Sequence, residues 1–168
     1  MERWADYQGT IYLRELKMKK IIFNTGTGYA SLPIRIFLAI VLFPHGAQKL
    51  LGWFNGHGFN GNMKFFTDTV GLPWIIGFLV IIIEFFGPLA LLVGFATRLW
   101  SIAILFVMTG IILTSYTDYF FMDWFRNQES EGFEFFLLAI GMSLMLSIYG
   151  GGGLSIDAKI AKKISVEG

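Results

Sequence analysis

Four long apolar stretches limit what this chain of 168 residues can fold into. They cover residues 32–52, 74–94, 99–116 and 133–149. Each approaches the roughly 20 residues that a helix needs to cross the hydrocarbon core of a bilayer. Because an unpaired backbone amide is costly in hydrocarbon, such stretches cross membranes as helices. The sequence therefore predicts an all-α integral membrane protein with a bundle of four transmembrane helices.

The composition supports this class and excludes several functions. Hydrophobic residues make up 55% of the chain and charged residues only 15%, whereas soluble domains carry about 25% charged residues. A net charge of +1 provides no basic surface that would bind nucleic acid. From the hydrophobic composition we expect the lipid bilayer and other membrane subunits as partners. The chain has no cysteine and two histidines, which excludes thiol chemistry and a convincing zinc site, and we expect no metal.

The basic residues predict the orientation of the bundle. If the amino terminus is cytoplasmic, Arg35 and Arg98 lie near the inner edge, where we expect interfacial anchors. Only Lys49, Lys64 and Arg126 then fall outside, and this asymmetry follows the positive-inside rule for four spans with both termini in the cytoplasm. The ten inner residues are Arg3, Arg14, Lys17, Lys19, Lys20, Arg35, Arg98, Lys159, Lys162 and Lys163.

Three segments follow from these spans: a cytoplasmic amino-terminal segment at 1–31, the bundle at 32–150 and a cytoplasmic amphipathic tail at 151–168. Residues 1–31 show no clean periodic pattern. Residues 63–70, in the first outer connection, are expected to form a short helix in the membrane interface. The tail has isoleucines at helical spacing with lysines on other faces. It is either a basic helix on the anionic inner leaflet or a surface helix that ends the chain.

Glu84 is the ionisable residue of the second stretch. Arg, Lys or Asp at the centre of a span costs about 2.5–3.5 kcal/mol on insertion scales, so such residues are usually paired or functional. Glu84 lies about ten residues into the stretch, hence ~15 Å deep at ~1.5 Å per residue. Pro88, four residues later, has no N–H to donate to the Glu84 carbonyl. The helix is therefore expected to open beside this carboxylate.

Polar side chains also gather at the end of the first stretch. His45, Gln48 and Lys49 are spaced i, i+3 and i+4, which places them on one face of a helix. Their depth is close to that of Glu84, since His45 lies ~20 Å from the inner edge at ~1.5 Å per residue. Glu134 enters at the outer end of the fourth stretch. These five residues are predicted to converge in the outer half of the bundle.

Several interpretations of this polar group stay open. In the first, Glu84 pairs with Lys49 or His45 as an internal staple, because charges buried in lipid need partners. In the second, the residues line a pocket that opens outward and can hydrogen-bond a quinone carbonyl or relay protons. In the third, His45 is a lone axial ligand to a haem-type or chlorophyll-type metal. His57, in the glycine-rich loop, is expected to be solvated.

The chain resembles the DoxX family over roughly residues 32–157. The resemblance implies a small four-helix protein of the bacterial inner membrane that is associated with redox systems. Some members are linked to quinone-dependent sulfur oxidation and others to membrane oxidoreductase complexes. By this resemblance, His45, Gln48, Lys49, Glu84 and Glu134 form the ligand site, and Pro88 departs from the family pattern, where a second glycine is common. The matching residues are Arg35, the run His45-Gly46-Ala47-Gln48-Lys49, Glu84 with Gly87, Thr97-Arg98 and Glu134.

Three functions are compatible with these observations. The chain is a quinone-linked redox subunit with no intrinsic cofactor other than a bound quinone, or a structural accessory subunit of a larger electron-transfer complex. The third function is a permeation pathway for protons or small molecules, which four short spans can form only as an oligomer. Quinone extracted together with the purified protein would separate the first function from the second.

Overall fold

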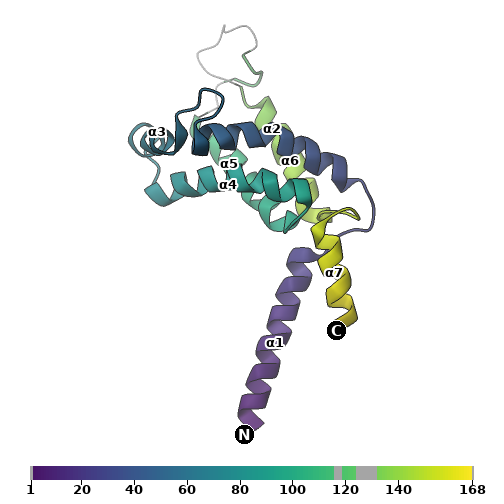
Figure 1. Ribbon diagram of the computed structural model, residues 1–168. Coiled ribbons are helices and arrows are strands. Elements are labelled where there is room, and N and C mark those ends of the chain that lie inside the picture. Colours follow the sequence, from purple (N-terminus) through teal and green to yellow (C-terminus); the bar gives the residue numbers. More distant parts are fainter. Residues whose placement is uncertain (1, 116–118, 124–131, 168) are drawn as a thin grey trace.

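The computed structural model of the protein describes residues 2–115, 119–123 and 132–167, and in these residues the secondary structure is entirely helical. Two helices, α1 and α7, lie side by side on one side of a bundle built from α2, α4, α5 and α6 (Figure 1). The elements in chain order are α1 (Glu2–Phe23), α2 (Ser31–Leu51), α3 (Gly58–Lys64), the π-helical turn η1 (Phe65–Thr69), α4 (Trp74–Val93), α5 (Thr97–Ser115), α6 (Glu134–Tyr149) and α7 (Ile156–Glu167).

Three of these helices are long and apolar enough to cross a membrane: α2, α4 and residues 97–114 of α5. The fourth predicted span corresponds to α6, which is apolar but has only 16 residues. At ~1.5 Å per residue it covers ~24 Å, somewhat less than the ~30 Å of a hydrocarbon core. The predicted all-α membrane bundle is confirmed, with a fourth helix that is shorter than the other three.

The bundle consists of two closely packed helix pairs. The most extensive contacts join α2 to α4 and α5 to α6, while a short turn after Gly94 joins α4 to α5. Aliphatic side chains from all four helices pack against one another between the pairs. Their van der Waals contacts stabilise the bundle, because lipid tails are as apolar as these side chains and provide no hydrophobic driving force. This core contains Leu38, Ala39, Leu42, Leu91, Ile104, Val107, Met108, Ala139 and Leu146.

Gly46 allows the closest approach of α2 to α4. A Cβ placed on Gly46 would collide with the backbone of Glu84 and Phe85, so its Cα–H points at the Glu84 carbonyl. This is the carbonyl that Pro88 leaves without an N–H donor inside the helix. A Cα–H···O contact at such a helix crossing partly replaces the missing hydrogen bond. The glycine and the proline therefore act at the same point of the interface.

The end of the bundle that the basic residues predict to be cytoplasmic, here called the inner end and its opposite the outer end, is closed by two buried charged side chains. Arg35 is fully buried and donates from Nη1 to the Leu91 carbonyl at 2.9 Å and from Nη2 to the Leu154 carbonyl at 2.6 Å. Asp157 accepts the backbone N–H groups of Ala96 at 2.7 Å and Thr97 at 2.9 Å, which caps the start of α5. Arg35 is thus part of the interior rather than the interfacial anchor that its position in the sequence suggested.

The segments outside the bundle differ in part from expectation. The segment 1–31, which shows no clean pattern, contains the 22-residue helix α1. The expected helix in the first outer connection exists, but it begins earlier, at Gly58, and continues into η1. In α7 the isoleucines differ in burial, since Ile164 is 7% exposed and Ile156 is 37% exposed. Much of the apolar face of the tail is therefore turned toward the protein.

The approach at Gly46 gives the first testable prediction. Changing Gly46 to Ala forces α2 away from the backbone of α4, and overpacking of this kind costs about 1–3 kcal/mol. We expect a lower melting temperature in mild detergent, measured by circular dichroism. Gly28→Ala is the matched control, because a Cβ on Gly28 meets nothing within 4 Å. Equal melting temperatures for the two variants would contradict the close contact.

Candidate functional site

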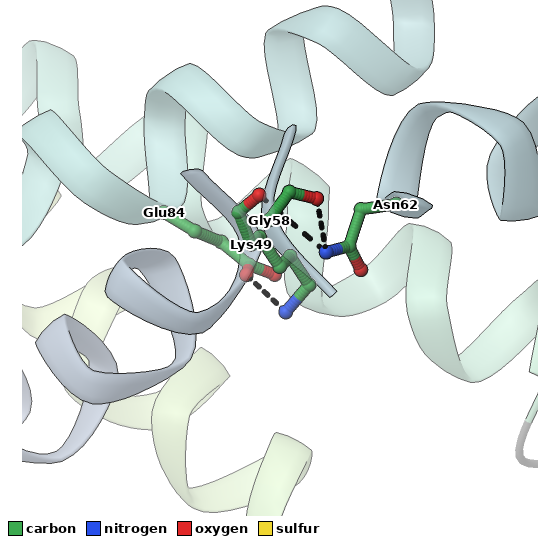
Figure 2. A network of polar contacts seen from close by, with 4 residues as sticks. All are labelled: Lys49, Gly58, Asn62 and Glu84. Carbon is green, nitrogen blue, oxygen red and sulfur yellow. Dashed lines mark hydrogen bonds and ion pairs between the residues drawn. The ribbon is translucent and has the colours of Figure 1, made fainter. Parts of the chain in front are cut away.

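An ion pair joins α2 to α4 at the outer side of the core. Lys49 Nζ lies 2.5 Å from Glu84 Oε2, and the two side chains are 23% and 2% exposed (Figure 2). In the described part of the chain, Oε2 finds no hydrogen-bond donor besides this ammonium group. The expectation that Glu84 has a cationic partner from the first span is confirmed, and the partner is Lys49.

The position of Lys49 is fixed by the loop that follows α2. Lys49 belongs to the last turn of α2, which ends at Gly52 in the left-handed conformation. Asn62, in α3, donates from Nδ2 to the Gly58 carbonyl at 2.8 Å and to the Lys49 carbonyl at 3.4 Å (Figure 2). The chain therefore folds back over the end of α2, and this holds the lysine backbone above the carboxylate.

A pocket of about 760 Å³ lies beside the ion pair. Its walls come from the outer halves of α4 and α5, from the ends of α2 and α6 and from η1. The lining residues are Leu42, His45, Lys49, Phe65, Phe66, Val70, Leu72, Ile76, Leu79, Val80, Ile83, Glu84, Ala103, Phe106, Val107, Met108, Gly110, Ile111, Thr114, Met122, Gly132, Phe135 and Phe136.

The pocket has mostly apolar walls and a few polar side chains. Its polar side chains are His45, Lys49, Glu84 and Thr114, and the remaining lining side chains are aliphatic, aromatic or absent at glycine. The His45 ring lies 5.9 Å from the Phe135 ring, measured between centroids. Ligand sites commonly combine apolar walls with a few placed polar groups that fix orientation. This pocket matches a molecule with a large apolar body and a polar end near the ion pair.

Gly110 faces the open part of this pocket. A Cβ placed on Gly110 meets nothing within 4 Å, so a larger side chain there would enter the pocket rather than strike a neighbouring helix. Gly141 on α6 is equally free of close neighbours, but it does not line the pocket. The two glycines therefore form a natural pair for filling the pocket and for a control.

Two of the five predicted site residues lie elsewhere. Gln48 donates from Nε2 to the Phe54 carbonyl at 3.1 Å, in the loop after α2. Phe54 has a φ of +52°, which is strained for a bulky residue, so this contact supports the loop. Glu134 accepts the Met122 N–H at 3.0 Å. The predicted convergence of five side chains is therefore wrong in part, since only His45, Lys49 and Glu84 line the pocket.

Several walls of the pocket could not be predicted from the sequence. Phe65 and Phe66 reach it from η1, and their spacing resembles many other aromatic pairs in the chain. Glu134 still acts indirectly, because Met122, which its carboxylate holds, is a lining residue. Among the residues that the structure describes, no group of three His, Cys, Asp or Glu side chains could hold a metal ion.

Comparison with known proteins identifies relatives of this chain. The family model described as DoxX matches residues 30–117. "Putative oxidoreductase CatD" of Bacillus subtilis (strain 168) is 29% identical over 139 residues, which cover 83% of this chain and 92% of that protein. "Inner membrane protein YqjF" of Escherichia coli (strain K12) is 34% identical over 112 residues, which cover 67% of this chain and 82% of that protein. No solved structure gives a significant match.

The ion pair gives the second prediction. Lys49→Met leaves the Glu84 carboxylate buried without its cation, and breaking a buried pair on one side costs on the order of 3 kcal/mol. The double variant Lys49→Met, Glu84→Met removes both charges and should regain most of this loss, because Met fills similar volume. The measurement is a double-mutant cycle of melting temperatures in detergent. Strictly additive effects of the two changes would contradict the pair.

Proposed function

Because this chain belongs to the DoxX family, we propose that it is a quinone-linked subunit of a redox system in a bacterial inner membrane. The single observation that carries this proposal is the apolar pocket with Lys49, Glu84 and His45 at one side. Two relatives support it by their names, since one is called an oxidoreductase and the other an inner membrane protein.

The pocket has the chemistry that a quinone requires. A quinone has a flat ring with carbonyl oxygens and an apolar tail, so it needs hydrogen-bond donors at one end and apolar walls elsewhere. Lys49 has an ammonium group and His45 an imidazole, and both can donate to a carbonyl oxygen. The volume of about 760 Å³ lies within the roughly 300–1,000 Å³ of typical ligand pockets.

In this proposal the protein binds, orients and supplies protons, while electrons come from a partner. A quinone, when bound, accepts two electrons and two protons. The chain has no cysteine, so thiol and iron–sulfur chemistry must belong to another subunit. Glu84 holds Lys49 beside the pocket, and His45 offers an imidazole whose ring nitrogens can donate and accept a proton.

The alternative is an accessory subunit that packs against a larger membrane complex without binding a quinone. The observation that favours it is the ion pair itself. Because each charge already has its partner, holding α2 on α4 is a sufficient role for the pair. Large apolar side chains also cover the outside of α4 and α5, which suits contact with lipid or with another subunit. Quinone retention separates these two functions.

The third prediction tests retention by filling the pocket. We expect quinone to co-purify with the wild-type protein in mild detergent and to be lost from Gly110→Leu, because the new side chain occupies the pocket. His45→Phe should also reduce the quinone content, since it removes a donor while staying compatible with an apolar interior. Gly141→Leu is the control and should retain quinone. Quinone is measured by extraction and chromatography, relative to protein.

The outcome distinguishes the two functions clearly. Equal quinone content in wild type, Gly110→Leu and Gly141→Leu would contradict binding in this pocket. Absence of quinone from all of them, together with a stoichiometric membrane partner, would favour the accessory subunit.

The fourth prediction concerns orientation. With both termini in the cytoplasm, ten basic residues lie on the inner side and three on the outer side, and this positive-inside asymmetry predicts cytoplasmic termini. Reporter fusions after Asp123, between α5 and α6, should then behave as periplasmic, and fusions at the carboxyl terminus as cytoplasmic. Alkaline phosphatase and green fluorescent protein report the two sides. A cytoplasmic signal after Asp123 would contradict the four-span arrangement.

A further inference from the structure

Helices α1 and α7 are fixed to the inner end of the bundle by backbone contacts. Arg98, in α5, donates from Nε to the Asn24 carbonyl at 2.8 Å, directly after α1. The N–H of Gly26 donates to the Tyr149 carbonyl at 3.1 Å, at the end of α6. Asp157, in the first turn of α7, caps α5. The direction in which these two helices leave the bundle is therefore set by the bundle itself.

That direction lies across the membrane-spanning helices. Figure 1 shows α1 running across the direction of α2, beside the inner end of the bundle, with α7 next to it. The two helices also contact each other. If α2 and α4 cross the bilayer, a helix oriented in this way runs along the membrane surface and does not extend into the cytoplasm.

The side chains of α1 suit that position. Tyr7, Ile11 and Met18 follow the i, i+4, i+11 spacing of one helical face, and all three are exposed. The exposed charged side chains at positions 14–20 are basic except for one glutamate, which leaves a local charge of +3 (four minus one). The basic residues are Arg14, Lys17, Lys19 and Lys20. Arg14 lies on the same face as this stripe, and the lysines lie beside it. An apolar face with basic residues on it and beside it is typical of helices that lie in the surface of an anionic bilayer, where a long arginine side chain reaches the head groups.

Helix α7 adds charge rather than apolar surface. Its Ile164 is buried, whereas Lys159 and Lys162 are exposed. On its own, α7 therefore has little apolar surface left to enter a membrane. Because α7 lies beside α1 (Figure 1), it brings these exposed lysines to the same end of the molecule as the basic residues of α1.

We propose that α1, with α7 beside it, binds the anionic surface of the inner leaflet as an in-plane platform. The Tyr7–Ile11–Met18 stripe enters the boundary between head groups and acyl chains, and the lysines contact lipid phosphates. A second copy of the chain fits this surface less well, because it would bring another +3 against the first. Each basic residue near such a surface contributes about fivefold to binding, so Lys17, Lys19 and Lys20 together contribute on the order of 100-fold.

The fifth prediction tests this platform by site-directed spin labelling, for which the absence of cysteine in the chain is an advantage. Single variants Ile11→Cys, Met18→Cys and Lys20→Cys are labelled in the full-length protein and reconstituted in vesicles of phosphatidylglycerol and phosphatidylcholine. We expect labels at 11 and 18 to collide with oxygen more than with a water-soluble nickel chelate, and the label at 20 to show the reverse. In pure phosphatidylcholine this contrast should weaken.

A charge variant provides the second measurement. Lys17→Gln, Lys19→Gln, Lys20→Gln should lose the dependence on phosphatidylglycerol, while Lys64→Gln, on the other side of the bundle, should keep it. Labels at 11 and 18 that are fully accessible to the nickel chelate in anionic vesicles would overturn the proposal. Spin–spin coupling between labels of two copies at position 18 would also overturn it, in favour of a dimer contact.

Discussion

The structure depends on neutralising charged side chains inside a bundle that has no water to solvate them. At the outer side of the core this is done by an ion pair between Lys49 and Glu84. At the inner end it is done by helix termini, because Arg35 meets carbonyls at the end of α4 and Asp157 meets N–H groups at the start of α5. The end of a helix carries partial negative charge and its start partial positive charge, so both side chains find the favourable sign.

These two solutions act on different parts of the fold. The inner contacts hold α4, α5 and the tail together around the short turn after Gly94, and the outer pair holds α2 against α4. Neither of them draws the outer half of α5 toward α4. The pocket occupies the space between those halves, where Gly110 has no neighbour within reach of a Cβ. The cavity thus opens beside the ion pair, toward the half of α5 that the pair does not contact.

The sequence predicted the helical bundle, but it did not predict the partner of each polar side chain. The length and hydropathy of the segments were sufficient to predict the bundle. The free-energy cost of an unpaired buried charge was sufficient to predict a cationic partner for Glu84. Gln48 shares a helical face with Lys49, yet its amide turns to the Phe54 carbonyl. That contact depends on a loop in which Phe54 and Asn55 adopt positive φ. Asn55 before Gly56 is a common turn signal, but no local pattern predicts positive φ for Phe54. Helix α1 was missed for a related reason, because exposed apolar residues outside its Tyr7–Ile11–Met18 face, such as Tyr12 and Leu13, obscure the helical period in the sequence.

The staple and the pocket, which the sequence left as alternatives, are compatible in this geometry. A lysine ammonium has three N–H donors, and Glu84 needs one of them. The same ammonium lines the pocket and its side chain is 23% exposed, so the carboxylate fixes the position of a cation that a ligand carbonyl could reach. A buried ion pair adds little net stability compared with apolar residues of the same size. An ion pair at this point rather than two apolar residues therefore fits the proposed role of Lys49 as a donor that the carboxylate holds in place for a ligand.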